Sequence, residues 1–319
     1  MSDTMQAVAI NQYGDEQTLE MITLPMPTIG EHQVLIKSKA TAINPLDWKL
    51  RAGYLKSMFD WAFPIVLGWD LAGVVTEVGS AVTDWQVGDE VFARPATSNR
   101  GTYAEYVAVD DELIARKPQN VTFEEAAAVP LAGETAWQAL FTHGHLKAGE
   151  TVLVQAGSGG VGSYAIQFAK AMGAHVITTT SAKNFDLVRD LGADEIIDYR
   201  NEKVADKAHN VDLVIDTIGG QSQVDAWSVL NPETGRQISI VGEAPETADI
   251  IKDTKMTFEA IWLMPNGKQL REIADLMADG KVKSIIDTVL PFSAEGLIKS
   301  HQLSATHHST GKIVIKFAD

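Results

Sequence analysis

The chain has 319 residues, enough for about two domains that each bury a core of their own. It carries a formal net charge of −16 and no cysteine, which excludes disulfides, thiolate nucleophiles and cysteine-based metal sites. Because no stretch gathers Lys and Arg, we expect no nucleic-acid partner. No secretory signal and no apolar run of membrane-spanning length is found, so we expect no membrane partner and a cytoplasmic protein.

The first third of the chain has the pattern of a β-barrel. Short apolar or alternating runs at residues 5–10 and 32–39 predict strands joined by Pro- and Gly-containing turns. Residues 40–54 continue from a strand through an Asn-Pro turn into a short helix. Val-rich strands separated by Gly-Ser and Gly-Asp turns follow at residues 64–93, and residues 104–109 add another alternating strand. We therefore predict a compact barrel of mostly antiparallel strands.

The pattern changes at Thr122, where Thr-Phe-Glu-Glu forms a capping box at a helix start. Strands and helices then alternate, which predicts a parallel, doubly wound sheet. The strands are expected at residues 151–155, 175–179, 195–198, 213–216 and 237–241, and the first helices at 161–172 and 184–191. The chain is expected to end with a helix at 266–279, a strand at 285–290, a helix at about 294–305 and a strand at 311–317.

A glycine loop follows the first strand of this alternating region. Gly157, Gly159 and Gly162 have the spacing G-x-G-x-x-G, and an amphipathic stripe of helical period comes directly after them. In this context the motif predicts a helix whose N-terminus binds a pyrophosphate, with a purely structural turn as the alternative. The predicted dinucleotide contacts in the loop are Gly157, Ser158, Gly159, Gly160, Val161 and Gly162.

Four motifs stand in order along the chain. They are Pro64-x3-Gly68-x-Asp70-x2-Gly73 with Val87-Gly88-Asp89, then Pro130-Leu-Ala-Gly-Glu-Thr-Ala-Trp137, the glycine loop, and Ser309-Thr-Gly-Lys-Ile-Val-Ile315. With these motifs the chain resembles the medium-chain dehydrogenase/reductase superfamily over nearly its whole length. The resemblance implies an α/β protein with a GroES-like β-barrel domain at 1–125 and a Rossmann doubly wound parallel-sheet domain at 126–265. It also implies that a C-terminal segment, 266–319, returns to the barrel, and that the active site lies in the cleft between the domains.

The zinc ligands of that superfamily are missing. Zinc alcohol dehydrogenases hold the catalytic metal with a Cys after the third strand and the His of a Gly-His-Glu triplet. Here those places hold Asn44 and the triplet Gly68-Trp69-Asp70. We therefore expect no metal, and the chain resembles the zinc-independent quinone oxidoreductase and enone reductase branch. Without a metal to polarise it, the hydride acceptor must be intrinsically electrophilic, as quinones and α,β-unsaturated carbonyls are.

The end of the second Rossmann strand indicates the cofactor. NAD-specific sites place an acidic residue there, whereas residues 177–184 contain none. Ser181 and Lys183 instead offer a hydroxyl and a cation suited to a 2′-phosphate, and by resemblance Tyr199 flanks the same phosphate. We therefore predict NADPH, with a solvated polar loop as the alternative interpretation. From the family positions, the further cofactor contacts are Thr135, Thr217, Val241, Gly242 and Lys312.

The candidate catalytic residues, Asn44, Asp47 and Tyr54, lie around the lost zinc ligand. Tyr54 is by type the best proton donor, with packing as its alternative role and solvent as an alternative proton source. Asn44 either contacts nicotinamide or substrate or caps the turn before Pro45, and Asp47 is expected to order that turn. Glu134, where relatives commonly carry an apolar residue, either faces solvent or adds a charge near the site.

Two other functions remain open from the sequence. An enoyl-thioester reductase would need a basic patch for the phosphates of CoA or a carrier protein, and no such patch is evident. A non-catalytic NADPH-binding or structural member of the superfamily is the second alternative. A homodimer joined through Rossmann sheet edges is the oligomeric state that the resemblance implies.

Overall fold

The computed structural model describes residues 3–318, and the chain forms two compact units. Met1–Ala132 and Pro265–Asp319 together make the N/C unit, and Gly133–Met264 makes the central unit. The boundary expected at 125/126 falls inside the helix α2 (Phe123–Ala127), and the one expected at 265/266 lies next to Pro265. Within residues 3–318, no helix is both long and apolar enough to cross a membrane.

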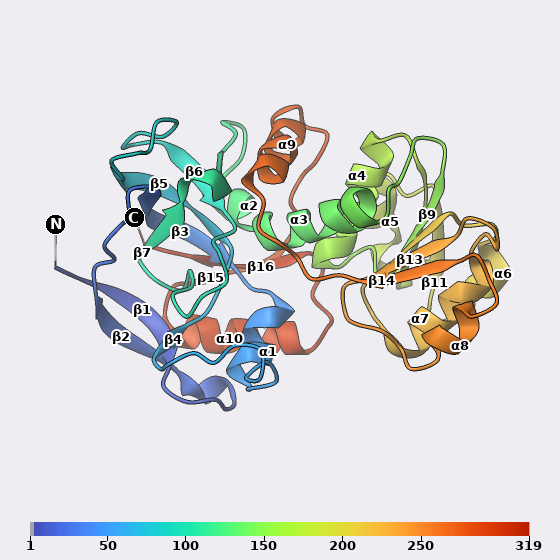
Figure 1. The fold of residues 1–319 in the computed structure, drawn as a ribbon, viewed down its shortest axis with the longest axis horizontal. Coiled ribbons are helices and arrows are strands. Elements are labelled where there is room, and N and C mark those ends of the chain that lie inside the picture. The colour runs from blue at the N-terminus through green and yellow to red at the C-terminus, as the bar shows by residue number, and fades with distance from the viewer. Residues whose placement is uncertain (1–2, 319) are drawn as a thin grey trace. The chain divides into compact units, whose positions relative to one another are not determined.

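Two sheets form the N/C unit (Figure 1). The smaller has the order β2-β1-β4, and the larger has the order β15-β16-β3-β5-β6-β8 with β7 paired to β3. Among the strand pairs of the described residues in this unit, only β15–β16 is parallel, which confirms the mostly antiparallel pairing predicted from the sequence. The strands are β1 (Thr4–Ile10), β2 (Leu19–Pro25), β3 (Gln33–Ala42), β4 (Ile65–Val66), β5 (Leu71–Val78), β6 (Glu90–Ala93), β7 (Tyr106–Asp110), β8 (Ile114–Arg116), β15 (Ile286–Pro291) and β16 (Lys312–Lys316).

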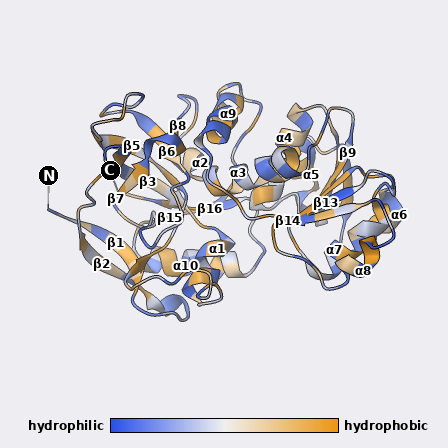
Figure 2. Ribbon diagram, viewed as in Figure 1, coloured by the Kyte–Doolittle hydropathy of each residue, from blue (hydrophilic) through white to orange (hydrophobic). Residues whose placement is uncertain are grey.

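Helices complete the N/C unit. They are α1 (Pro45–Arg51), α2, α9 (Gly267–Ala278) and α10 (Ala294–Ala305), with 3-10 turns η1 (Glu16–Thr18) and η2 (Asp111–Leu113). The capping box at Thr122 is confirmed, because its hydroxyl accepts from the backbone N–H of Glu125 and the Glu125 carboxylate accepts from Thr122 N at 2.8 Å. In α9 the buried apolar positions recur at helical spacing, and Figure 2 shows orange and blue alternating around this helix.

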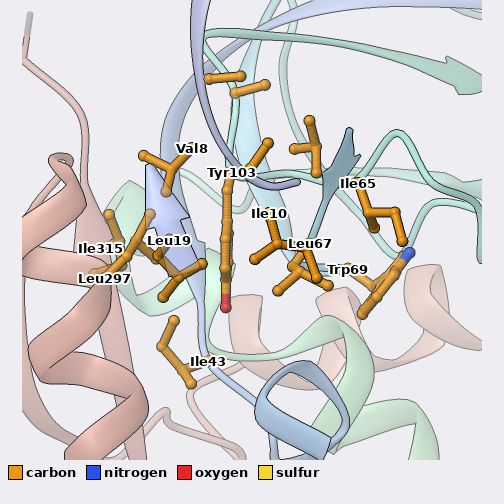
Figure 3. Packing of buried hydrophobic residues seen from close by; sticks show 14 of the residues in the cluster. Val8, Ile10, Leu19, Ile43, Ile65, Leu67, Trp69, Tyr103, Leu297 and Ile315 are labelled. Atoms are coloured by element: carbon orange, nitrogen blue, oxygen red, sulfur yellow. The ribbon is translucent and has the colours of Figure 1, made fainter. Parts of the chain in front are cut away.

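An apolar cluster lies between β1, β4, α1 and α10 of the N/C unit and includes Tyr103. Val8, Ile10 and Leu297 are fully buried in it, and α1 packs against α10. Figure 3 shows the ring of Tyr103 standing between Leu19 and Ile10, with its hydroxyl oxygen directed toward the side where Ile43 lies. The apolar surroundings therefore hold this ring in place while its polar atom reaches neighbouring side chains.

The central unit is a six-stranded parallel sheet of the order β11-β10-β9-β12-β13-β14. Numbered along the chain this is 3-2-1-4-5-6, the doubly wound Rossmann order, and it confirms the predicted fold class. The strands are β9 (Thr151–Val154), β10 (His175–Thr180), β11 (Glu195–Asp198), β12 (Leu213–Asp216), β13 (Arg236–Ser239) and β14 (Thr257–Ala260). The strand order reverses between β9 and β12, so the switch point lies at their carboxyl ends.

Helices precede and connect these strands. They are α3 (Pro130–Trp137), which contains the unit boundary, then the π-helix η3 (Gln138–His143), α4 (Gly160–Ala171), η4 (Ala182–Asn184), α5 (Phe185–Asp190), α6 (Val204–Lys207), α7 (Gly220–Ala226), η5 (Trp227–Val229) and α8 (Thr247–Ile251). The predicted strands and helices of this region are present within a few residues of their expected ends.

Candidate active site

The glycine loop lies at the carboxyl end of β9 in the central unit. A Cβ added to Gly157 would lie 2.0 Å from Thr178 Oγ1, and one added to Gly162 would lie 2.3 Å from the carbonyl oxygen of Ala156. A Cβ on Gly159 would meet only the Ala156 oxygen, at 3.2 Å. The first and third glycines are therefore required by packing, whereas the second leaves open space at the backbone, where a pyrophosphate can approach.

Ala156, and not the first glycine of the motif, makes the turn before α4. Ala156 adopts a left-handed φ of 51°, whereas Gly157 is not among the residues of positive φ. Gly157 is needed because Thr178 of the neighbouring strand β10 crowds it, not because it makes the turn. The requirement for glycine thus comes from the close approach of the loop after β9 to β10.

The N-terminus of α4 is open for an anion. Its N-cap Gly159 has no side chain, so no side-chain cap satisfies the N–H groups of the first turn, at Gly160 and Val161. The helix has 12 residues, so its dipole adds to the attraction for negative charge. Ser158 Oγ accepts hydrogen bonds from Thr180 Oγ1 and Asn184 Nδ2, each at 2.9 Å. The backbone cradle predicted at residues 157–162 therefore fits the pyrophosphate of a dinucleotide.

The ends of β10 and β11 form the edge next to this loop. Thr180 pairs with Asp198 in the parallel register, so Ser181 and Tyr199 follow at the same edge of the sheet. Tyr199 N donates to Thr180 O at 3.4 Å, and the Tyr199 side chain is 54% exposed. Ser181 is buried and Lys183 is exposed in η4. Three predicted phosphate contacts are thus placed near one another on adjacent strand ends.

No acidic side chain ends β10, as predicted. The acidic residue that ends β11, Asp198, is engaged in hydrogen bonds within its own turn. Asp198 accepts hydrogen bonds from Arg200 N at 3.2 Å and from Asn201 Nδ2 at 2.8 Å. Arg200 was missed by the sequence reasoning, although it directly follows Tyr199. Its Nε lies 3.4 Å from the Tyr199 hydroxyl, and its guanidinium lies 5.7 Å from the ring centroid. A second cation therefore stands beside the predicted phosphate contacts.

The loops after β12 and β13 contain the other predicted cofactor contacts. Thr217 Oγ1 donates to Gln155 O at 3.0 Å, which ties the end of β12 to the glycine loop across the switch point. Val241 is 43% exposed, and its side chain lies near Gly219. Gly242 has a φ of 108°, a conformation that favours glycine. Thr135 is 6% exposed in α3.

A buried carboxylate supports both loops and was not predicted. Asp216 Oδ1 accepts from the backbone N–H groups of Ile218 and Gly219, and its Oδ2 accepts from Gln223 Nε2 at 2.6 Å and Ser239 Oγ at 2.7 Å. Gln223 Nε2 also donates to the carbonyl of Gly242 at 2.8 Å. Because Asp216 and Gln223 are fully buried, these contacts hold the two loops in fixed conformations.

In the N/C unit, Asn44 lies in a buried cluster of charged groups. Its Nδ2 donates to Asp70 Oδ2 at 2.8 Å, and its Oδ1 accepts from Lys312 Nζ. Lys312 and Asp70 form an ion pair at 3.0 Å, with side chains 4% and 0% exposed. Lys312 was predicted as a cofactor contact. The structure places its ammonium against Asn44 and Asp70, so its cofactor role stays a prediction.

Asp47 begins a second buried network. Its Oδ2 accepts from Asn44 N at 2.7 Å and from the Tyr103 hydroxyl at 2.9 Å, so it orders the turn into α1, as expected. Arg51 Nε donates to His301 Nδ1 at 3.2 Å, which leaves the imidazole hydrogen on Nε2, 3.1 Å from the Tyr103 hydroxyl. The hydrogen bonds therefore run in one direction, from Arg51 through His301 and Tyr103 to Asp47.

Burial governs the charge states in this network. It raises the pKa of Asp47 to about 7, and it lowers the pKa of His301 to about 3, with the nearby Arg51 charge as a second cause. Burial also raises the pKa of Tyr103 well above its ordinary value, followed by the effect of the Asp47 charge. At neutral pH, His301 is thus neutral and Tyr103 keeps its proton.

Tyr54 and Glu134 differ in exposure. Tyr54 is 71% exposed, and its ring stands edge-on to Trp48 at 6.4 Å between centroids. Trp48 also meets His307 edge-on at 5.8 Å.

Glu134 is completely buried, so the alternative in which it faces solvent is wrong. Among residues 3–318, no group of three or more His, Asp or Glu side chains is placed to hold a metal ion.

Comparisons with known proteins agree with this architecture. A family model described as "Alcohol dehydrogenase GroES-like domain" matches residues 30–119, and one described as "Zinc-binding dehydrogenase" matches residues 191–315. The chain is 36% identical to a chloroplast envelope quinone oxidoreductase homolog of Arabidopsis thaliana, with 98% of each chain covered. It is 37% identical to an NADPH-dependent alkenal/one oxidoreductase of the same plant, with 98% of this chain and 79% of the relative covered.

Solved structures of quinone oxidoreductases have the same fold as this chain. The structure of the quinone oxidoreductase from Coxiella burnetii has a TM-score of 0.90 and 33% identity, and the match covers 98% of this chain and 99% of the other. Together with the glycine loop, the Rossmann strand order and the GroES-like pairing, these likenesses establish the family. The chain is an oxidoreductase that belongs to the medium-chain dehydrogenase/reductase superfamily, in the branch of the quinone oxidoreductases and enone reductases.

Proposed function

We propose that this protein is an NADPH-dependent reductase of quinones or α,β-unsaturated carbonyl compounds. The observation that carries the proposal is the end of β10, where Ser181 and Lys183 stand in place of an acidic residue beside an open glycine loop. The names of the relatives, which include an NADPH-dependent alkenal/one oxidoreductase and a 2-methylene-furan-3-one reductase, support the same cofactor and acceptor class.

Different residues are proposed to bind different parts of the cofactor. The glycine loop and the first turn of α4 would hold the pyrophosphate, and Ser181, Lys183 and Tyr199 would hold the 2′-phosphate, with Arg200 as an added cation. Thr217, Val241 and Gly242 lie on loops that Asp216 and Gln223 keep rigid. When bound, the nicotinamide supplies the hydride for an electrophilic acceptor. We keep Thr135 as a proposed contact by family position. A cofactor contact of Lys312 is the alternative to its pairing with Asn44 and Asp70, and the NADPH affinity of Lys312→Met decides between the two roles.

On the acceptor side, charge develops on the carbonyl or quinone oxygen, and a hydrogen-bond donor lowers the free energy of that anion. Asn44 is the proposed donor, because it carries N–H groups and is fixed by neighbouring charges. Tyr54 is the proposed residue at the solvent side, where its exposure allows proton exchange with water. Asp47 is proposed to position Asn44, because its carboxylate accepts a hydrogen bond from the Asn44 backbone N–H.

The cofactor proposal is tested with Lys183→Ala. We expect this change to weaken NADPH binding by about ten- to a hundredfold, because a charge-assisted contact to the 2′-phosphate is lost. NADH affinity should stay within about twofold, because NADH has no such phosphate. Fluorescence titration of both cofactors measures the two constants. Lys170→Ala, at the other end of α4 in a pair with Asp194, is the matched control. Equal losses for NADH and NADPH, or no loss, would contradict the assignment.

The substrate class is tested by following NADPH oxidation with menadione, acrolein, methyl vinyl ketone and crotonyl-CoA. We expect turnover with the quinone or with the enal and enone. Turnover of crotonyl-CoA alone would favour the enoyl-thioester alternative. The chain is also similar to CurK enoyl reductase, at 25% identity and a TM-score of 0.88, which is the reason for including this substrate. NADPH binding without turnover of any acceptor would favour a non-catalytic member.

We further propose a cytoplasmic homodimer. The outer edge of β14 ends the strand order of the central sheet, so a second copy could extend that sheet there. Sedimentation equilibrium measures the mass, and a mass equal to one chain would rule the dimer out. Cell fractionation tests the compartment, for which the plant and animal relatives named chloroplastic or mitochondrial give the competing outcome.

A further inference from the structure

The ion pair of Lys312 and Asp70 is buried in the N/C unit beside Asn44. Asp70 has both oxygens in use: Oδ1 accepts from Leu131 N at 2.6 Å, and Oδ2 accepts from Asn44 Nδ2 at 2.8 Å and Lys312 Nζ at 3.0 Å. Removing two charges from water costs more than an isolated pair usually returns. A pair kept at 4% and 0% exposure therefore calls for a role beyond simple packing.

The two charges fix the orientation of the Asn44 amide. The ammonium of Lys312 requires an acceptor and meets Oδ1, whereas the carboxylate of Asp70 requires a donor and meets Nδ2. Rotating the amide by half a turn would place NH₂ against the ammonium and the carbonyl against the carboxylate. Both contacts would then be repulsive, so the amide is held in one orientation.

One hydrogen of Asn44 Nδ2 remains for a ligand. The amide nitrogen has two hydrogens, one of which points to Asp70. Within residues 3–318, no partner for the other hydrogen is found. The Lys312 ammonium draws electron density toward Oδ1 and so makes the remaining N–H a stronger donor. Charge, orientation and an available hydrogen are thus combined on one side chain.

We propose that Lys312 and Asp70 are positioning residues that hold and polarise Asn44 as the hydrogen-bond donor to the acceptor oxygen. This inference rests on the proposed reductase function. The acceptor gains a hydride, with its two electrons, at a carbon conjugated to the carbonyl, and the nicotinamide cofactor is oxidised. Negative charge moves to the oxygen, which Asn44 stabilises without giving up its hydrogen. A proton from water then completes the product.

The kinetic test uses Asn44→Ala, Lys312→Met and the double variant, with NADPH and whichever of menadione or methyl vinyl ketone the wild type reduces. We expect each single change to lower kcat by about a hundredfold, as loss of an oxyanion donor does. Because Lys312 acts through Asn44, the double variant should be little slower than the slower single variant. The NADPH dissociation constant should stay within about twofold in all three variants.

Controls separate positioning from folding. Lys316→Met, on the same strand but with its side chain 55% exposed, should keep wild-type kcat. Lys312→Gln keeps a neutral donor toward Asn44 and serves if Lys312→Met does not fold; we expect an intermediate kcat. Losses that multiply in the double variant would overturn the inference. An unchanged kcat in Lys312→Met would also overturn it. A tenfold weaker NADPH affinity with kcat retained would overturn it too, because Lys312 would then be a cofactor ligand.

A second measurement needs no substrate. Amide NMR, with the Asn44 side-chain signals assigned by their loss in Asn44→Ala, reports hydrogen exchange at Nδ2. We expect exchange to be at least about tenfold faster in the Lys312 variant than in wild type, because the amide is no longer held from both sides. Equal exchange rates would overturn the positioning role. If wild type reduces none of the acceptors, the proposed function fails, and this measurement still decides whether Lys312 orients Asn44.

Discussion

Asp47 is a fully buried carboxyl group with one oxygen, Oδ1, that has no hydrogen-bond partner among residues 3–318. The other oxygen accepts two hydrogen bonds. A proton on Oδ1 removes the cost of an uncompensated buried charge, which is the physical reason that the pKa rises to about 7. Asp47 therefore titrates near neutrality beside a proposed site.

This pKa makes stability depend on pH. Folded Asp47 holds its proton up to about pH 7, whereas an ordinary aspartate loses it near 3.8, so the folded state binds more protons in between. The stabilisation is fully present below the unfolded-state pKa of about 3.8, and it is lost as the pH rises through the folded-state pKa of about 7. We expect the free energy of unfolding of Asp47→Asn, relative to wild type, to increase by about 2–4 kcal/mol between about pH 4 and 7.

Urea unfolding of both proteins across this range measures the effect. His301 contributes with the opposite sign, because its pKa is lowered to about 3 and the unfolded state binds more protons between that value and 6.5. This contribution is common to both proteins, so the difference isolates Asp47. Parallel stability curves for wild type and Asp47→Asn would contradict the prediction.

At the scale of the element, the glycine loop offers two substitutions with different consequences. Gly157→Ala places a methyl group 2.0 Å from Thr178 Oγ1, so we expect it to lower the free energy of unfolding by about 1–3 kcal/mol and to weaken NADPH binding. Gly159→Ala meets only one oxygen, at 3.2 Å, and should change stability by less than about 0.5 kcal/mol. It should still weaken NADPH binding by about tenfold or more, because the methyl group stands where the pyrophosphate approaches.

Thermal unfolding without cofactor and fluorescence titration with NADPH separate these effects. The matched pair is informative because both changes add the same methyl group two residues apart. Retention of NADPH affinity in Gly159→Ala would show that the loop backbone does not approach the phosphates.

Some elements escaped prediction for identifiable reasons. β14 is a four-residue edge strand in which no residue is buried, so it lacks the apolar signal of the inner strands β9 and β12. β2 is also an edge strand and ends at Pro25, between the predicted strands at 5–10 and 32–39, where proline and glycine predict turns. Central, buried strands are predictable because both of their faces are apolar, whereas edge strands have no such constraint.

At the scale of the whole molecule, the net charge of −16 acts against compactness through self-repulsion. Raising the salt concentration from about 20 to 150 mM at neutral pH should increase the unfolding temperature by a few degrees, because screening weakens that repulsion. Near pH 5, close to the sequence pI of about 4.9, the same salt should have little effect. Scanning calorimetry at both pH values measures the difference, and an equal salt effect at both would mean that specific ion pairs dominate.

The sequence by itself determined the fold class, the glycine loop, the missing acid at the end of β10 and the missing zinc ligands. The glycine loop and the end of β10 depend on residues close together in the chain, so spacing and residue type carry the information. The missing zinc ligands follow from the resemblance to the superfamily. Only the tertiary structure placed Lys312 against Asn44, 268 residues away, and His301 against Arg51, 250 residues away. Such contacts form because burial of β16 and α10 brings distant side chains together, and no local pattern specifies which polar groups then meet.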